Sequence, residues 1–194
     1  MPLRIIHFPH PTLRYKAKPI RRVNQELRDL AAEMLELMYE AKGVGLAATQ
    51  VDLPIRMFVA NPAGAKGEGE EWVIINPEVQ RPRGNEAGEE GCLSLPGIYG
   101  SVKRPKTIRL TGYDLKGNPI DADFDGYLGR VFQHEVDHLN GVMFIDRVSE
   151  ENLAALSGPL DDLENELRSM QSSGQLGSDE QLIADLKAWE DKFA

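Results

Sequence analysis

Two histidines and a glutamate stand at a spacing that suits metal-dependent proton transfer. His134 and His138 are four residues apart in the stretch QHEVDH, and residues four apart lie on one face of an α-helix. Two imidazoles at this spacing can bind one divalent cation. Glu135 directly follows the first histidine, where a carboxylate can accept a proton from a water that the cation activates. This HExxH pattern predicts a metal-dependent hydrolase.

A catalytic metal of this kind needs a third protein ligand. One protease group supplies it by continuing the pattern as HExxHxxGxxH, but here Phe144 occupies the ligand position although Gly141 is in place. A second group supplies a glutamate from a later helix. The chain offers four such glutamates, none of which differs from its acidic surroundings: Glu150, Glu151, Glu164 and Glu166.

The remaining candidate ligand is Cys92, the only cysteine of the chain, in the stretch EGCLSLP. A lone cysteine is usually a small buried hydrophobic residue. This one lies between a glycine and a turn proline, in a chain that also carries HExxH. We therefore interpret Cys92 as a thiolate ligand of the metal.

Three segments of the chain form a recognisable set. GVGLAATQ (residues 43–50), EGCLSLP (residues 90–96) and QHEVDHLNG (residues 133–141) strongly resemble the three signature motifs of the peptide deformylase family, in that family's order. The resemblance covers about residues 1–148. It implies an α+β fold with mixed or antiparallel sheets around a central HExxH helix. Residues 149–194 are then expected to be an acidic, helical C-terminal extension of the catalytic unit, not an independent domain.

The resemblance implies an enzyme of protein biosynthesis that removes the N-formyl group from the N-terminal formylmethionine of newly made polypeptides and releases formate. Cys92, His134 and His138 would hold one divalent metal ion per chain, with Fe(II) expected and Zn, Ni or Co as substitutes. By affinity alone, two imidazoles and a thiolate favour zinc. Metal-activated water would attack the formyl carbonyl, with Glu135 as general base and then general acid.

The resemblance also implies roles for residues around the metal. The Gln50 side-chain amide and the Leu93 backbone N–H would stabilise the negative charge that grows on the formyl oxygen. Glu90 and Arg104 resemble a structural ion pair of the family that would brace the Cys92 loop.

The peptide substrate is expected to bind in extended form, beside Val44 and Gly45 on one side and Gly91 on the other. Three positions share a helix stripe with the histidines and are expected near the pocket for the methionine side chain: Tyr127, Arg130 and Val131. For Arg130 we weigh two interpretations, an aliphatic stem on the pocket wall with its charge in solvent, and a surface arginine on the helix flank. Asp137 either orients a ligand or the helix, or is a solvated acid.

Charge is unevenly distributed along the chain. Residues 146–194 contain 12 acidic and 4 basic residues, a net charge of −8, while the whole chain carries −9. Affinity for nucleic acid depends on Lys and Arg that neutralise phosphates, so we expect no direct sequence-specific nucleic-acid binding. Any docking to the ribosome near the exit tunnel would use a basic surface of the catalytic unit. The tail should be dispensable for the chemistry, because every assigned residue precedes it.

The sequence also bears on location. No apolar run approaches the roughly 20 residues that cross a bilayer, so we expect no membrane partner. A single cysteine allows no intrachain disulfide, which fits a reducing cytoplasm. We therefore expect a cytoplasmic enzyme of bacterial type, compatible with a bacterial, organellar or viral source.

Hydrophobic periodicity and turn residues predict the elements that position these groups. A helix over residues 24–42 has Asn24 as its N-cap and Gly43 as its end. Asp123 or Asp125 caps a metal-binding helix over residues 127–140, which Gly141 ends. Strands are expected at residues 56–61, 72–76 and 106–114, a turn-rich stretch at 81–91, and tail helices at 150–156, 160–170 and 179–193, with the first break at residues 158–159.

Two other functions fit parts of the pattern. The first is a zinc endopeptidase of the gluzincin kind, whose third ligand is an acid from the tail. Replacing Cys92 with alanine would separate it from a deformylase, because the protease would keep its metal. The second is a structural metal site in an interaction module, which predicts closed coordination by four ligands. Only three good ligands are visible in the sequence, which argues against it.

Overall fold

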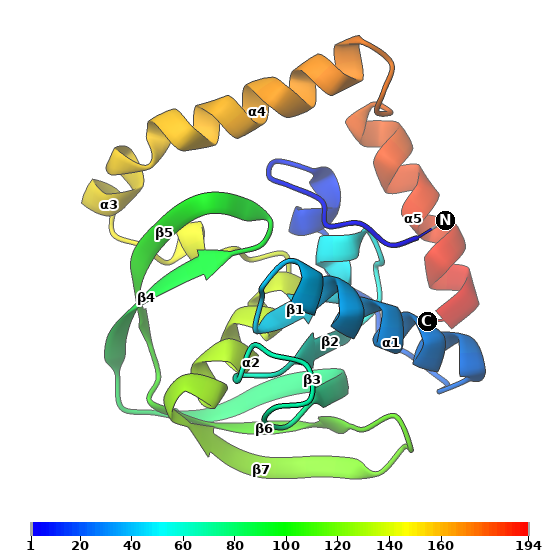
Figure 1. Ribbon diagram of the computed structural model, residues 1–194, viewed down its shortest axis with the longest axis vertical. Coiled ribbons are helices and arrows are strands. Elements are labelled where there is room, and N and C mark those ends of the chain that lie inside the picture. The colour runs from blue at the N-terminus through cyan, green and yellow to red at the C-terminus, as the bar shows by residue number, and fades with distance from the viewer. Residues whose placement is uncertain (1, 194) are drawn as a thin grey trace.

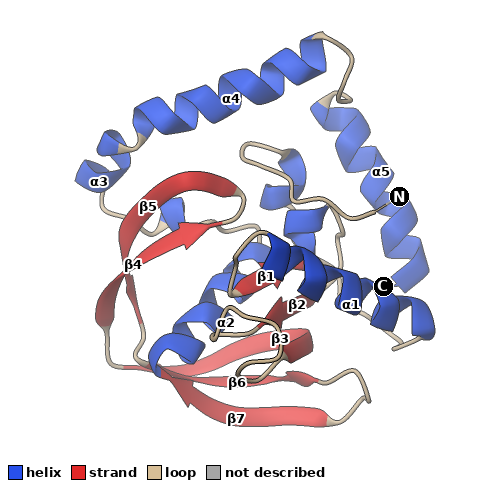
Figure 2. Ribbon diagram, viewed as in Figure 1, coloured by secondary structure: helices blue, strands red, loops and turns tan. Residues whose placement is uncertain are grey.

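The computed structural model describes residues 2–193 and has the predicted α+β architecture (Figure 1, Figure 2). Its elements in chain order are η1 (Pro11–Arg14), α1 (Gln25–Glu40), β1 (Gly45–Ala47), η2 (Ala48–Val51), β2 (Met57–Ala60), β3 (Trp72–Arg83), β4 (Glu86–Cys92), β5 (Leu95–Arg104), β6 (Thr107–Tyr113), β7 (Pro119–Asp125), α2 (Gly126–Leu139), η3 (Phe144–Asp146), α3 (Glu150–Ala155), α4 (Ser157–Ser172) and α5 (Asp179–Phe193). Within the described residues, no helix is both long and apolar enough to span a membrane.

Five strands form one antiparallel sheet in the order β1-β2-β3-β6-β7. Successive side chains of a strand point to opposite faces, and β2 is buried on both. Met57 and Val59 pack in the cluster that contains α1, whereas Phe58 and Ala60 pack in the cluster that contains α2. This double burial explains why β2 is a continuous apolar run with no polar alternation.

Helix α2 lies in the middle of the molecule, against the five-stranded sheet (Figure 1). Its apolar face includes Phe132, whose ring centroid lies 5.3 Å from that of Phe58 and 4.9 Å from that of Phe124. The helix matches the prediction within one residue at each end. Asp125 occupies the N-cap position, but its side chain makes no capping hydrogen bond. Gly141 ends the helix region in the left-handed conformation, with φ of 74°, as expected of a C-terminal glycine.

The predicted turn-rich stretch at residues 81–91 is wrong. The chain there forms most of β4, which pairs with β5 as a separate two-stranded ribbon running from Glu86 opposite Arg104 to Gly91 opposite Tyr99. Glycine and glutamate have low intrinsic strand propensity, so this strand depends on its partner across the ribbon and not on its own composition. Leu93 and Ser94 make the tight turn between the two strands.

Helix α1 begins as predicted, because the Asn24 side chain accepts a hydrogen bond from the Leu27 backbone N–H at 2.8 Å. Its end differs from the prediction. The helix stops at Glu40, and Lys42, not Gly43, takes the left-handed conformation with φ of 57°. Gly43 is needed for another reason, since an added Cβ would lie 2.6 Å from the Leu93 side chain.

The helices after residue 149 wrap back onto the rest of the chain. Helices α3 and α4 meet at Leu156, and Gly158 and Pro159 lie in the first turn of α4, so the break predicted at residues 158–159 comes earlier. Proline fits the first turn of a helix because its missing N–H has no partner there. Figure 1 shows α4 crossing the top of the molecule and α5 descending beside the N-terminus.

Helix α5 is anchored by burial and hydrogen bonding. Leu186 is 1% exposed, and Phe193 packs in the cluster of α1 and β2. The Tyr15 hydroxyl donates to the Glu190 carboxylate at 2.5 Å, which raises the pKa of Tyr15 to about 12. The extension is therefore joined to the main core of the molecule.

Candidate metal and catalytic site

Three donor atoms from two elements converge on one point. Helix α2 presents His134 and His138 on one face, and the end of β4 brings Cys92 toward them. The Cys92 Sγ and His138 Nε2 atoms are 3.2 Å apart, as are the Nε2 atoms of the two histidines. All three donor atoms lie within 4.8 Å of one another. A thiolate and two imidazoles facing one point form a donor set that fits zinc or a neighbouring transition metal.

The glutamates of the tail are too far into solvent to serve as the third ligand. The four candidate glutamates of the tail lie on α3 and α4 and are solvent-exposed. Phe144 is 1% exposed and its ring stacks on that of His134, with centroids 6.4 Å apart. Among the described residues, Cys92, His134 and His138 are the one group of potential ligands. The endopeptidase reading, which required a carboxylate ligand from the tail, is therefore wrong.

Glu135 is placed to handle a proton. Its side chain is buried, and its Oε2 atom has no hydrogen-bond partner among the described residues. Burial raises the pKa of Glu135 to about 7, although the neighbouring His134 charge opposes the shift. A carboxyl group with its pKa near neutrality can both accept and return a proton.

Gln50 is held so that its amide nitrogen faces the metal ligands. Its Oε1 atom accepts a hydrogen bond from the Ala47 backbone N–H at 2.8 Å. This bond fixes the amide and leaves Nε2 to point to Cys92 Sγ at 3.4 Å and Ser94 Oγ at 3.2 Å. Ser94 is fully buried and was not among the residues predicted from the sequence, although it lies within the EGCLSLP stretch.

Glu90 joins the metal ligands to the surrounding charges. Its carboxylate lies 3.0 Å from His134 Nδ1, accepts two hydrogen bonds from Arg104 at 2.6 and 2.8 Å, and a third from Arg130 at 2.7 Å. Burial by itself would raise the pKa of Glu90, but the hydrogen bonds from Arg104 and His134 outweigh it and hold the pKa well below its usual range. A permanently charged Glu90 can fix the orientation of the His134 ring.

The two histidines differ in their electrostatics. Burial would lower the pKa of His134, but hydrogen bonds to Cys92 and Glu90 outweigh it and raise the pKa to about 10. Burial and the charge of His134 hold the pKa of His138 well below its usual range. The anionic groups around His134 thus attract positive charge to the point where the ligands meet.

The Asp137 carboxylate makes no hydrogen bond to either histidine among the described residues, and its partners are arginines. It accepts a hydrogen bond from Arg104 at 2.7 Å and two from Arg147, each at 2.5 Å. Because Arg104 also binds Glu90, Asp137 is linked to His134 through two intermediate side chains. The expectation that Asp137 orients a ligand or the helix fits this geometry better than that of a solvated acid.

A cavity of about 640 Å³ opens beside the metal ligands and Glu135. All six residues that the sequence suggested for substrate binding line it: Val44, Gly45, Gly91, Tyr127, Arg130 and Val131. Leu93 also lines it, as do Ile98 and Tyr99 from β5, which the sequence did not suggest because β5 itself was not predicted.

Both interpretations of the Arg130 charge are wrong. The guanidinium does not reach into solvent. It donates to the Glu90 carboxylate and to the backbone carbonyls of Val102 at 3.1 Å and Glu86 at 2.9 Å. The side chain is 15% exposed, and its charge is neutralised inside the protein. Arg130 can therefore stand beside a cavity for an apolar side chain.

Glycine is required at two positions of the cavity because neighbouring side chains approach the backbone closely there. A Cβ added to Gly45 would overlap the carboxylate of Glu135. A Cβ added to Gly91 would lie 2.6 Å from the ring of Tyr99. Cysteine and histidine donor atoms that meet beside a buried carboxyl group, at a cavity lined by Gly45 and Gly91, are the arrangement expected of a metal-dependent hydrolase.

Comparisons with known proteins identify which family of hydrolases this is. The family model of polypeptide deformylase matches residues 2–154. A peptide deformylase from Rhodopirellula baltica is 58% identical over 190 residues, which cover 98% of this chain and 94% of that protein. A chloroplastic peptide deformylase 1B from Oryza sativa is 44% identical over 84% of this chain and 61% of that longer protein.

Solved structures agree. The crystal structure of a plant peptide deformylase has a TM-score of 0.85 and 37% identity, over 92% of this chain and 96% of that chain. One from Synechococcus elongatus, in complex with actinonin, has a TM-score of 0.77 and 40% identity, over 81% of this chain and 87% of that chain. The chain belongs to the polypeptide deformylase family, the metal-dependent hydrolases that remove the N-formyl group from nascent peptides.

Proposed function

We propose that Cys92, His134 and His138 hold one divalent cation, and that Glu135 moves the proton during removal of the formyl group from N-terminal formylmethionine. The observation that carries this proposal is the meeting of three donor atoms beside a buried carboxyl group whose pKa is raised to about 7. The donor atoms fit a transition metal, and the carboxyl group is suited to accept and return a proton at neutral pH.

The chemistry then follows from the residues around the cation. A bound divalent cation acts as a Lewis acid that activates a water. The Glu135 carboxylate accepts one proton from that water as its oxygen bonds to the formyl carbon. Glu135 returns the proton to the amide nitrogen when the carbon–nitrogen bond breaks, so that formate and a free amino terminus leave. The Gln50 amide and the Leu93 backbone N–H donate to the formyl oxygen while it carries negative charge.

The supporting residues fix this arrangement. Glu90 orients His134 through the ring nitrogen that faces away from the cation, and Arg104 holds Glu90. Asp137 holds Arg104 from the opposite side. Such partners of metal-bound histidines maintain ring orientation and ligand basicity.

The substrate peptide lies extended between the backbones of Val44 and Gly45 on one side and Gly91 on the other. The methionine side chain then enters the part of the cavity beside Tyr127, Arg130 and Val131. Two observations support this placement: these residues line one cavity, and the pairing of Arg130 with Glu90 removes an uncompensated charge from the wall.

Fe(II) is the working cation in this proposal, with Ni or Co as active substitutes and Zn as a tight but less active one. Family resemblance favours iron, while the donor set alone favours zinc in affinity. Affinity and turnover are separate properties, so the two statements are compatible.

The catalytic unit in this proposal is residues 1–148, and residues 149–194 are a helical extension that adds stability. The enzyme acts in the cytoplasm and meets its substrates near the exit of the ribosome. The single free cysteine is consistent with a reducing compartment. Co-sedimentation of the enzyme with ribosomes tests this partner directly, and a protein that stays in the supernatant at low salt would contradict it.

Formate release tests the central proposal. The metal-loaded enzyme is incubated with formyl-Met-Ala-Ser, and formate is measured. The unformylated peptide is the control, because an endopeptidase would cut either peptide whereas a deformylase acts on the formylated one alone. Cleavage within the unformylated peptide would contradict the proposal.

A further inference from the structure

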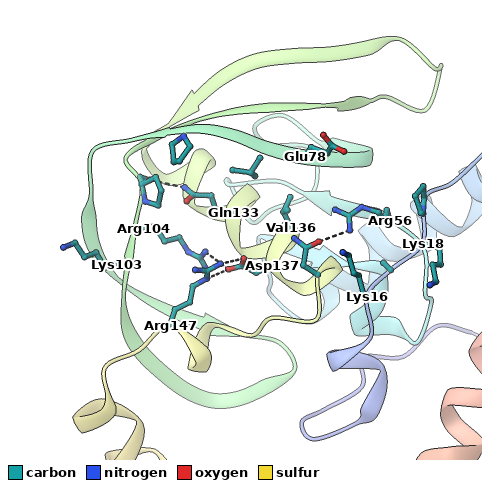
Figure 3. Close-up of a pocket in the computed structure, with 16 residues that line it drawn as sticks. Lys16, Lys18, Arg56, Glu78, Lys103, Arg104, Gln133, Val136, Asp137 and Arg147 are labelled. Carbon is teal, nitrogen blue, oxygen red and sulfur yellow. Dashed lines mark hydrogen bonds and ion pairs between the residues drawn. The ribbon is translucent and has the colours of Figure 1, made fainter.

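A second cleft lies behind the metal-binding helix. It has a volume of about 870 Å³ and contacts the face of α2 that carries Gln133, Val136 and Asp137. None of the residues that line it lines the cavity beside the metal ligands. Figure 3 shows its lining residues, which come from the N-terminal arm, the residue before β2, β3, the end of β5, α2 and the segment after η3. The mechanism proposed above leaves this cleft unused.

The cleft is strongly positive in a chain that is negative overall. Two carboxylates line it, those of Glu78 and Asp137. Six cationic side chains line it: Lys16, Lys18, Arg56, Lys103, Arg104 and Arg147. The lining therefore carries a net charge of +4, whereas the whole chain carries −9. Such a local excess of cations raises the local concentration of anionic ligands.

Several of these charges have no partner within the protein. Among residues 2–193, the lysines with an ion pair within 4.0 Å are Lys18, Lys66 and Lys192, of which Lys18 lies 4.0 Å from Glu190. Lys16 and Lys103 make no such pair, and both are exposed. Arg56 donates to the carbonyl oxygens of Leu139 and Pro77 and to the Asn140 amide oxygen, all of them neutral acceptors. Its charge is therefore not cancelled by a contacting carboxylate, unlike the charge of Arg104.

The cations stand in two groups with a strip of α2 between them. Lys16, Lys18 and Arg56 lie on one side, and Lys103 and Arg147 lie on the other (Figure 3). Cations spread along both sides of a cleft favour an extended polyanion, such as a chain of phosphates, over a single phosphate ion. The apolar part of the lining offers contact area for sugars and bases: Ala17, Pro19, Val79, Pro82, Pro105 and Val136.

The cleft is built into the fold and needs no rearrangement to form. The N-terminal arm is fixed by hydrogen bonds from the Lys18 N–H to the Pro54 carbonyl at 2.7 Å and from the Arg56 N–H to the Lys18 carbonyl at 2.9 Å. The Ala17 N–H also donates to the Leu139 carbonyl at 3.0 Å, at the end of α2. Preformed sites lose less conformational entropy on binding.

We infer that this cleft binds the phosphodiester backbone of RNA without reading its sequence. The two groups of cations favour a polyanion, and the apolar residues of the lining suit its sugars and bases. RNA is favoured over an acidic protein because the substrates are newly made polypeptides, which emerge from a particle rich in RNA. To that extent the inference rests on the proposed function. RNA held behind α2 would leave the substrate cavity open on the other side of the helix.

Fluorescence anisotropy with a labelled oligouridine of about 12 nucleotides tests the inference, since this length spans a typical single-strand site. The full-length, metal-loaded enzyme is compared with the double variant Lys16→Ala/Lys103→Ala. Neither lysine makes an internal ion pair, so the fold should be retained, and thermal melts check this. The matched control is Lys116→Ala/Lys187→Ala, which removes the same charge from two exposed positions outside the cleft.

The expected result is quantitative. Each phosphate contact to a single strand contributes a slope of about −0.7 in log K against log salt concentration. Loss of two contacts should make the slope less negative by about 1.4 and weaken binding about 25-fold at about 0.1 M salt. The control variant should bind as the wild type does.

Three outcomes would overturn the inference: no RNA binding by the wild type at low salt, equal loss in the cleft and control variants, or tighter binding of a polyglutamate peptide than of the RNA. The last would point to an acidic protein partner. Formate release from a short formyl peptide is measured in parallel. Failure of that reaction with RNA binding intact contradicts the proposed function, and the reverse contradicts the inference alone.

Discussion

Helix α2 separates two cavities that differ in how far their charged side chains are paired within the protein. On the side of His134, the buried Glu90 carboxylate contacts Arg104, Arg130 and His134 in one network, and the proton acceptor Glu135 is the exception, with an Oε2 atom that has no partner among the described residues. On the other side, Lys16 and Lys103 have no ion-pair partner among the described residues. Buried charges are costly unless they are paired, so the closed network suits a site whose geometry must not vary. Exposed unpaired cations cost little and suit a ligand that varies in sequence.

The most damaging change to the metal side should be Glu135→Gln. Glutamine has nearly the same size and shape, but it cannot accept the proton. Turnover should fall by about 10²- to 10⁴-fold, the usual contribution of general acid–base catalysis. Metal content, measured by atomic absorption, should stay at the wild-type level because Glu135 is not a ligand. Near-normal turnover in this variant would end the proposed mechanism.

Exchange of the cation should have the next largest effect. Protein purified without oxygen should contain iron, be highly active and lose activity on exposure to air, because both the ion and the Cys92 thiolate can oxidise. Nickel should restore turnover that is stable in air, and zinc should fill the site with much weaker activity. Metal analysis and formate release are measured on each form. A zinc form as active as the iron form would refute the assignment of iron.

Glu90→Gln should weaken the metal site without removing a ligand. It leaves Arg130 without its carboxylate partner and Arg104 with Asp137 alone, and it loosens His134. Changes to such partners of metal ligands typically cost 10- to 100-fold in metal affinity or activity. The matched control is Glu78→Gln, which removes the same charge from the second cleft, behind α2. Because the two sides of α2 differ, Glu78→Gln should leave metal binding and formate release unchanged. An equal loss of metal binding or formate release in Glu78→Gln and Glu90→Gln would contradict this comparison.

The smallest effect on activity is expected from Leu186→Ala in α5. Leu186 is 1% exposed, and truncation of a buried leucine to alanine typically costs about 2–5 kcal/mol of unfolding free energy. Ile183→Ala is the control, because Ile183 is 37% exposed in the same helix and should cost about 0.5 kcal/mol or less. Urea unfolding measures both. Turnover of the folded protein should match the wild type, and a lower value would show that the extension shapes the cavity.

The sequence was most informative where function and local structure coincide. The spacing of His134 and His138 predicted the helix, the face that carries the donor atoms and the chemistry together, and Cys92 and Gln50 followed from motif context. All of these converge in the structure. The same local patterns also gave the N-cap of α1 and the limits of α2 to within a residue.

Features that depend on distant contacts were not predictable in this way. Strands β4 and β5 exist because they pair with each other, and their own composition favours turns. The inward position of the Arg130 charge depends on Glu90 and on two carbonyls of that ribbon. The convergence of Lys16, Lys103 and Arg147 in one cleft joins three segments that lie far apart in the chain.

Strand β1 lies at the edge of the five-stranded sheet, and β4 belongs to a ribbon of two strands, so both have an unpaired side. A peptide that lies between Gly45 and Gly91 can be read as a temporary strand joining the two sheets. Main-chain groups are the same in every polypeptide, and alternate side chains of a strand point away from the surface that holds it. Beyond the first residue, binding through main-chain groups therefore tolerates different amino acids in the peptide. One active site can then serve a whole proteome of unrelated sequences, with its selectivity concentrated at the terminal residue.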